Sequence, residues 1–179
     1  LYQHYKKIAD LVDIPQILYN VPGRTSVDMQ PETVLRLSTH KNIVGIKEAS
    51  GNKDRSLSLM KLCSKDIKIF TGDDKTSMSD ISDGFSGNIS VTANVAPLEM
   101  HQMCQSALEG DIENASKLNS NLDILHDLLF CESNPIPVKW CLHKMGLIKK
   151  GIRLPLTWMD QKFDRPLTEG LIKSGIIDE

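Results

Sequence analysis

The chain has 179 residues, of which 40% are hydrophobic and 25% charged, a composition typical of a globular protein with one sizeable core. Its 21 lysines and arginines nearly balance 23 aspartates and glutamates, and no run of like charge occurs, which argues against nucleic acid as a partner. Since every apolar stretch is too short to cross a bilayer or to serve as a signal peptide, we expect a cytoplasmic protein without membrane association.

The first half of the chain alternates helix-like and strand-like segments. Apolar residues recur at helical spacing over residues 1–12, and the run "PQILYNVP" predicts a strand that is followed by a helix over 31–40. The run "NIVGIKEAS" predicts a second strand, followed by a helix that Asn52 or Asp54 can cap. The run "IKIFTGDD" predicts a third strand with a short helix after it over 75–83, and "GNISVTAN" predicts a fourth strand.

Beyond residue 94 the pattern is helical throughout, with helices expected at 97–110, 111–130, 137–146 and 167–175. Apolar strands that alternate with amphipathic helices indicate a parallel sheet. A closed (β/α)8 barrel needs eight strands and about 250 residues, which exceeds this chain, and the chain starts with Leu1 where a native chain starts with Met. We therefore expect an α/β fold: the C-terminal part of a TIM (β/α)8 barrel over 1–96, with about four βα units, and a C-terminal α-helical domain over 97–179.

A lysine, Lys47, ends the second predicted strand. Because side chains alternate along a strand, Lys47 is expected to share a face with Gly45, which would leave space beside the lysine stem. The other face would pack on helices and carries Val44, Ile46 and Glu48. By the same alternation, the inner face of the neighbouring strands is expected to carry Ile17, Tyr19, Ile43 and Ile69.

Tyr19 ends the first predicted strand, as Lys47 ends the second. Catalytic groups of barrels stand at the C-terminal ends of strands, so a phenol and an amine would converge there. A desolvated lysine has a lowered pKa and can attack a ketone to form a Schiff base, and a phenol can carry the protons. Alternatively, Lys47 is a strand-end cation that pairs with Glu48 or reaches solvent, and Tyr19 is a core aromatic. Periodicity alone favours this second reading.

Five motifs change that balance: "YNVPGRT" (19–25), "GIKEASGN" (45–52), "TGDD" (71–74), "ISVTANVAP" (89–97) and "NPIPVKW" (134–140). Together and in this order they resemble dihydrodipicolinate synthase, a pyruvate-dependent lyase family within the class I aldolase and N-acetylneuraminate lyase superfamily. The resemblance implies that Lys47 is the Schiff-base lysine and that Tyr19 is its acid/base phenol. It also implies that Arg24 holds the carboxylate of the second substrate, that the backbone of Ile89 contacts pyruvate, and that Gly72 is a glycine of the substrate-binding pocket.

Some of these residues also have purely structural explanations. For Ile89 and Gly72 the alternatives are packing and a turn, and Asp73 with Asp74 is expected to form a turn and cap the following helix. The cysteines lack zinc-site spacing, so no metal is expected, and Schiff-base chemistry needs no cofactor.

The resemblance further implies a function in lysine and diaminopimelate biosynthesis. The reaction condenses pyruvate with L-aspartate 4-semialdehyde to give 4-hydroxy-tetrahydrodipicolinate, in a homo-oligomer that is a dimer or a tetramer. Two alternatives stay open: a related aldolase, such as N-acetylneuraminate lyase or a keto-deoxy-sugar-acid aldolase, and a non-catalytic fragment of the barrel. The threonine pair and second tyrosine of the family's proton relay are not found in these 179 residues.

Overall fold

The computed structural model describes residues 1–178. It divides into two compact units, Leu1–Ile89 and Ser90–Glu179, which are described separately below. The units are defined by the contacts within each part of the folded chain. The division into a barrel part over 1–96 and a helical domain over 97–179 stays a prediction.

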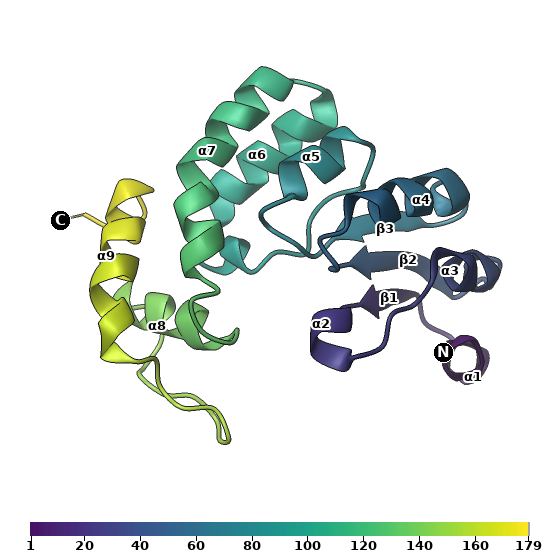
Figure 1. Ribbon diagram of the computed structural model, residues 1–179, viewed down its shortest axis with the longest axis horizontal. Coiled ribbons are helices and arrows are strands. Elements are labelled where there is room, and N and C mark those ends of the chain that lie inside the picture. Colours follow the sequence, from purple (N-terminus) through teal and green to yellow (C-terminus); the bar gives the residue numbers. More distant parts are fainter. Residues whose placement is uncertain (179) are drawn as a thin grey trace. The chain divides into compact units, whose positions relative to one another are not determined.

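The first unit is a three-stranded parallel sheet with helices between the strands, in the order β1-β2-β3 (Figure 1). Its elements are α1 (Tyr2–Leu11), β1 (Gln16–Asn20), α2 (Pro22–Thr25), α3 (Pro31–Ser38), β2 (Ile43–Glu48), α4 (Lys53–Cys63), β3 (Lys68–Thr71) and α5 (Ser77–Ser82). As predicted, Asn52 caps α4, because its Oδ1 accepts a hydrogen bond from the backbone N–H of Arg55 at 3.1 Å.

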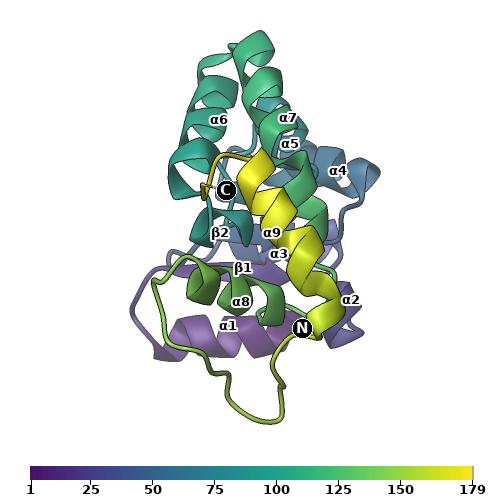
Figure 2. The same cartoon turned by 90° about the vertical axis from the view of Figure 1, so that its left-hand side faces the viewer.

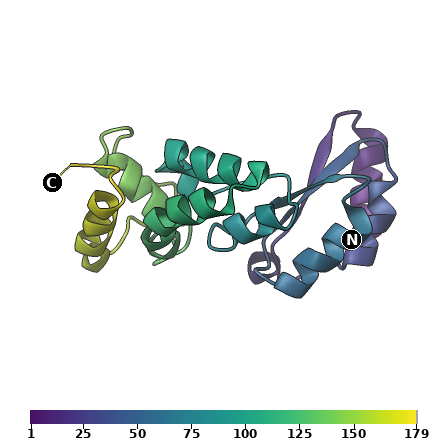
Figure 3. The same ribbon diagram turned by 90° about the horizontal axis from the view of Figure 1, so that it is seen from above.

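One face of this sheet is buried beneath α3 and α4 (Figure 1, Figure 3). Leu18, Ile46 and Ile69 lie side by side across the three strands on this face, and none is more than 2% exposed. The prediction that Ile69 belongs to the opposite face is wrong. Phe70 takes that place, since it is the register partner of Lys47.

The pairing of β1 with β2 is irregular at one point. Gln16 pairs with Ile43, but the next residue, Ile17, pairs with Gly45, so Val44 is an extra residue in β2. Such a β-bulge shifts the alternation by one residue. As a result Ile43 is buried on the helix side, while Val44 is 38% exposed, the reverse of the predicted orientation.

The expected fourth strand is reduced to a single bridge between Asn88 and Thr71. Three backbone hydrogen bonds join this segment to β3: the N–H of Ser86 donates to the carbonyl of Ile69 at 2.7 Å, the N–H of Thr71 to the carbonyl of Gly87 at 3.0 Å, and the N–H of Ile89 to the carbonyl of Thr71 at 2.9 Å. Two residues later Val91 has helical angles (φ −80°, ψ −46°), so an extended strand cannot continue.

The second unit is helical, as predicted. It contains η1 (Thr92–Asn94), α6 (Pro97–Glu109), α7 (Ile112–Leu128), α8 (Ile136–Lys144), η2 (Gln161–Phe163) and α9 (Asp164–Lys173). Helices α6 and α7 lie side by side (Figure 1, Figure 2) and are joined at Gly110, whose φ of +80° suits a glycine. Helix α9 packs closely on α7, and Gly170 permits this approach, since a Cβ there would lie only 2.6 Å from Leu128 Cδ1.

Within residues 1–178 no helix is both long and apolar enough to span a membrane.

Candidate active site

Tyr19 and Lys47 meet at the C-terminal ends of β1 and β2, as predicted. They are register partners, and Lys47 Nζ lies 4.5 Å from the centre of the Tyr19 ring. Both side chains are on the sheet face opposite the buried one, so Tyr19 is 43% exposed and Lys47 is half-buried. The amine therefore lies against an aromatic face on the exposed side of the sheet.

Gly72, just past the end of β3, provides the room for the lysine stem. A Cβ at this position would lie 2.5 Å from Lys47 Cε and 2.8 Å from Ala49 Cβ, distances that atoms cannot adopt. The backbone N–H of Gly72 donates to the carbonyl of Glu48 at 2.7 Å, which fixes the close approach. The predicted pocket glycine is thus brought to the predicted nucleophile.

The space predicted beside Gly45 does not exist. A Cβ on Gly45 would lie 2.9 Å from the carbonyl oxygen of Lys68 and 3.4 Å from the Phe70 ring. The neighbouring strand fills this position, so Gly45 permits close strand packing and leaves no room for a ligand.

Burial lowers the pKa of the Lys47 amine, because the charged form loses hydration. The Asp74 carboxylate raises this pKa and the Arg24 guanidinium lowers it.

Asp74 is only 2% exposed and accepts a hydrogen bond from Asn88 Nδ2 at 2.8 Å. The turn expected here is built by Asp73, whose Oδ1 accepts from the N–H of Lys75 at 3.0 Å, whereas no side chain caps α5. Asp74 instead belongs to the electrostatic environment of the amine.

Arg24 lies in the last turn of α2, a short helix that the sequence analysis did not predict, and its side chain is exposed. Ile89 is 40% exposed beside the end of β3. The structure therefore brings three predicted residues, Tyr19, Arg24 and Gly72, near the amine of Lys47. Ile89 lies on the segment that pairs with the end of β3. Their roles toward substrates stay predictions.

A buried polar cluster behind these residues was missed. Glu48 is 3% exposed and accepts a hydrogen bond from Arg55 Nε at 2.7 Å and from Asn20 Nδ2 at 3.1 Å. Glu48 therefore pairs with Arg55 on α4 and is not the partner of Lys47. Alternation along β2 did place Glu48 on the helix side, but only the position of α4 identifies its partner.

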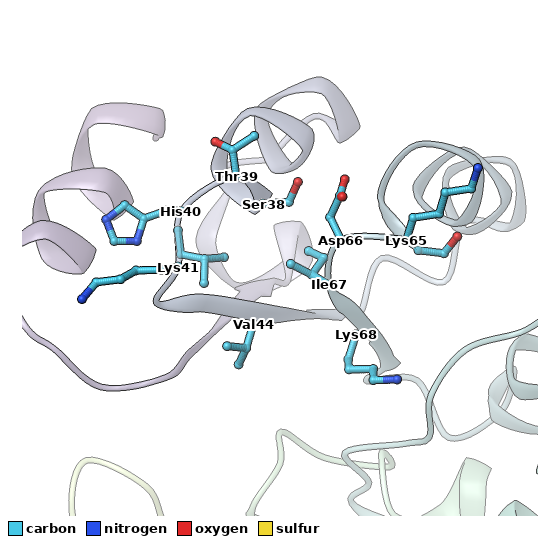
Figure 4. A pocket seen from close by; sticks show the side chains of 11 residues that line it. Ser38, Thr39, His40, Lys41, Val44, Lys65, Asp66, Ile67 and Lys68 are labelled. Carbon is cyan, nitrogen blue, oxygen red and sulfur yellow. The ribbon is translucent and has the colours of Figure 1, made fainter.

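A hollow of about 420 Å³ lies at the other end of the sheet (Figure 4). Residues 38–41 and 64–68 line it together with Ile43 and Val44. Figure 4 shows Val44 and Lys68 pointing away from Thr39 and Asp66, in agreement with the bulge. Lys47 is not part of this hollow, and among residues 1–178 no three His, Cys, Asp or Glu side chains gather as metal ligands would.

Comparison with known proteins gives consistent matches over nearly the whole chain. A family model described as the dihydrodipicolinate synthetase family matches residues 1–173. The 4-hydroxy-tetrahydrodipicolinate synthases of Pseudomonas syringae and Pseudomonas putida are 54% and 56% identical over 177 residues. These matches cover 99% of this chain but 61% of each relative.

Solved structures agree with the sequence matches. The chloride-inhibited dihydrodipicolinate synthase from Acinetobacter baumannii, complexed with pyruvate, is 50% identical with a TM-score of 0.96, covering 98% of this chain and 60% of that one. A monomeric dihydrodipicolinate synthase variant is 38% identical with a TM-score of 0.95, over 99% and 60% of the two chains.

The expected fold class, part of a TIM barrel followed by helices, is thereby confirmed. The match over residues 1–173 and the close likeness to solved synthases lead to one assignment: this chain belongs to the dihydrodipicolinate synthetase family.

Proposed function

We propose that this protein condenses pyruvate with L-aspartate 4-semialdehyde to give 4-hydroxy-tetrahydrodipicolinate, through a Schiff base on Lys47. The observation that carries the proposal is the environment of the Lys47 amine. The lysine stem packs against Gly72, Lys47 Nζ lies 4.5 Å from the centre of the Tyr19 ring, and burial lowers the pKa of the amine. A lysine of this kind is suited to nucleophilic attack, since a larger fraction of it is neutral than of an exposed lysine.

The proposed chemistry begins with attack of Lys47 Nζ on the ketone carbon of pyruvate. A C–N bond forms and the ketone oxygen leaves as water, which requires proton delivery. The proposed proton carrier is the Tyr19 phenol, whose ring centre lies 4.5 Å from the amine. Loss of a methyl proton gives an enamine, whose carbon attacks the aldehyde of the second substrate. The substrate amine then displaces Lys47 from the imine carbon, which closes the ring and frees the enzyme.

Arg24 is the proposed anchor for the carboxylate of the semialdehyde. Its guanidinium is close enough to Lys47 to lower the pKa of that amine, and it is exposed to an incoming ligand. A guanidinium fork can bind a carboxylate with two parallel hydrogen bonds. Gly72 and the backbone of Ile89 are proposed to contact pyruvate.

The names of the relatives support this assignment, since the P. syringae and P. putida proteins are called 4-hydroxy-tetrahydrodipicolinate synthases and the A. baumannii structure contains pyruvate. We further propose a place in lysine and diaminopimelate biosynthesis in the cytoplasm, and assembly as a homo-oligomer. The monomeric variant among the similar structures makes oligomeric state a question for direct measurement, for example by sedimentation.

The test is reductive trapping with pyruvate and borohydride, followed by peptide mapping. It uses the complete polypeptide that the source organism produces. We expect one adduct, on Lys47, and its loss in Lys47→Ala. Lys68→Ala is the matched control, because Lys68 lies on the same face of the sheet but at the start of β3. An adduct on another lysine would refute the assignment of the nucleophile. Cleavage of N-acetylneuraminate to pyruvate, without condensation of pyruvate with the semialdehyde, would favour the aldolase alternative.

A further inference from the structure

A buried cluster of polar side chains lies directly behind the candidate active site. Asn20 and Glu48 are register partners, one residue beyond Tyr19 and Lys47, and are 2% and 3% exposed. Because side chains alternate along a strand, Asn20 and Glu48 point to the helix side while Tyr19 and Lys47 point to the open side. Any movement of the two strand ends would therefore be shared by both pairs.

Arg55 on α4 connects this pair to the surrounding loops. Its Nε donates to Glu48 at 2.7 Å, its Nη2 donates to the carbonyl of Met29, and its Nη1 lies 3.3 Å from Asp28 Oδ1. Asn20 makes matching contacts, since its Nδ2 donates to Asp28 at 2.9 Å and its Oδ1 accepts from the N–H of Met29 at 2.9 Å.

The cluster joins four separate segments: the end of β1, the end of β2, the start of α4 and the loop after α2, which is the helix that carries Arg24. Glu48 also accepts from the N–H of Ser50 at 2.8 Å, which fixes the turn after β2. A buried ion pair of this kind is weak evidence for stability, because apolar side chains of similar volume often stabilise as well. Its distinguishing property is geometric, since three acceptors from two segments, Glu48 of β2 and Asp28 with Met29 of the loop after α2, converge on one planar guanidinium.

We propose that Arg55 is a positioning residue which, through Glu48 and Asn20, sets the distance and orientation between the Tyr19 phenol and the Lys47 amine. This inference rests on the proposed function of those two residues. Misplacement of a reacting group by about 1 Å can cost 10²-fold in rate. The cluster would thus act on catalysis without touching a substrate.

Arg55→Lys is the direct test. An ammonium keeps the charge but cannot reach Glu48, Asp28 and the Met29 carbonyl together. We expect the rate of pyruvate capture per folded molecule, measured by borohydride trapping, to fall about 10- to 10²-fold, the range that a displaced catalytic group produces. The folded fraction is measured by circular dichroism.

A double-mutant cycle with Tyr19→Phe separates positioning from a general loss of structure. If Arg55 acts by placing the phenol, Arg55→Lys should have little further effect once the hydroxyl is removed. Equal fold-losses in both backgrounds would overturn the proposal, as would capture at the wild-type rate in Arg55→Lys.

Two buried asparagines provide a matched comparison. Asn20 ends β1, next to Tyr19 and Lys47. Asn42 precedes β2, at the end of the strand far from Lys47, and its Nδ2 donates to the carbonyls of Ala9 and Val12 at 3.0 Å and 3.3 Å. Asn20→Ser should slow capture per folded molecule, whereas Asn42→Ser should lower stability and leave that rate unchanged. Equal slowing in both variants would contradict the proposal.

The wild-type protein distinguishes this inference from the proposed function. Absence of a pyruvate adduct on wild-type Lys47 would overturn both. A normal wild-type adduct together with unaltered capture in Arg55→Lys and Asn20→Ser would overturn only the positioning role.

Discussion

The amine of Lys47 must lose a proton before it can attack a ketone, so the rate of adduct formation should rise with pH. Because burial lowers the pKa of this group from 10.5, the midpoint of the rise is expected below that value. Asp74→Asn removes a charge that raises the pKa and should move the midpoint to lower pH. Arg24→Gln removes a charge that lowers it and should move the midpoint to higher pH. Trapping rates measured across a pH series check both signs, and shifts in the same direction would contradict this electrostatic account.

Gly72 is expected to tolerate no side chain. The Cβ of Gly72→Ala would overlap Lys47 Cε and Ala49 Cβ, so the lysine stem must move. We expect pyruvate capture to fall about 10²-fold and stability to fall by about 1–3 kcal/mol. Trapping and urea denaturation measure the two effects. Gly23→Ala is the control, because no atom of residues 1–178 lies within 4 Å of a Cβ there. Equal losses in both variants would show that the space at Gly72 is unimportant.

Tyr19→Phe keeps the ring that lies against Lys47 and removes only the hydroxyl. Loss of a positioned proton carrier typically costs 10²–10⁴-fold in rate, and we expect a fall of about 10² or more in synthase turnover. The melting temperature should hardly change, since the side chain is 43% exposed. Turnover at the wild-type rate would make the phenol a packing residue.

The residues whose chemistry is unusual for their position could be identified from the sequence. The residues that surround them in space could not. Lys47 and Tyr19 stood out because an amine and a phenol end apolar strands, and alternation along those strands placed them on one face. The roles of Asp74 and Arg55 could not be inferred in this way. Each depends on where another segment, the Asn88 region or α4, packs in space, and that placement leaves no local pattern in the chain.

At the scale of the element, α4 presents the clearest test. Asn52→Ala removes the hydrogen bond to the N–H of Arg55 and should lower the free energy of unfolding by about 1 kcal/mol. Asn52→Gly should cost only a few tenths of that, because glycine is also tolerated at the N-cap. Urea denaturation of the two variants provides the comparison. An equal cost for both would indicate that the loss arises from contacts other than the cap.

The helices of both units were largely predictable, because apolar spacing, prolines at first turns and cap residues all act locally. The failures at this scale have tertiary causes. The bulge in β2 comes from its pairing with β1, and the fourth strand fails because the chain turns helical at Val91. The short helix α2 within "YNVPGRT" is only four residues long, too short to show a period.

At the scale of the whole molecule, the open face of the sheet is the notable surface. Ile17 and Val44 are 48% and 38% exposed on the same side as Tyr19. Contiguous exposed apolar groups bind apolar dyes and promote association. We expect residues 1–179, expressed alone, to bind anilinonaphthalene sulfonate and to self-associate, as judged by fluorescence and light scattering.

Substitutions locate the surface responsible. The double substitution Ile17→Thr with Val44→Thr should reduce dye binding, whereas Leu147→Thr, at a single side chain that is 65% exposed in the second unit, should not. A monomeric chain without dye binding would contradict the expectation. Fold recognition at this scale came from five motifs in order. The family match over residues 1–173 confirms it although the predicted fourth strand forms only one bridge, because the recognition depended on no single strand.

The extra residue in β2 has a consequence for how related sequences can differ in length. Since Val44 has no partner in β1, a deletion there would leave Gly45, Ile46 and Lys47 opposite the same residues of β1 as before. A deletion between Gly45 and Lys47 would instead turn the amine toward the helices, because side chains alternate with a period of two. Insertions and deletions should therefore be tolerated on one side of Gly45 and eliminated by selection on the other.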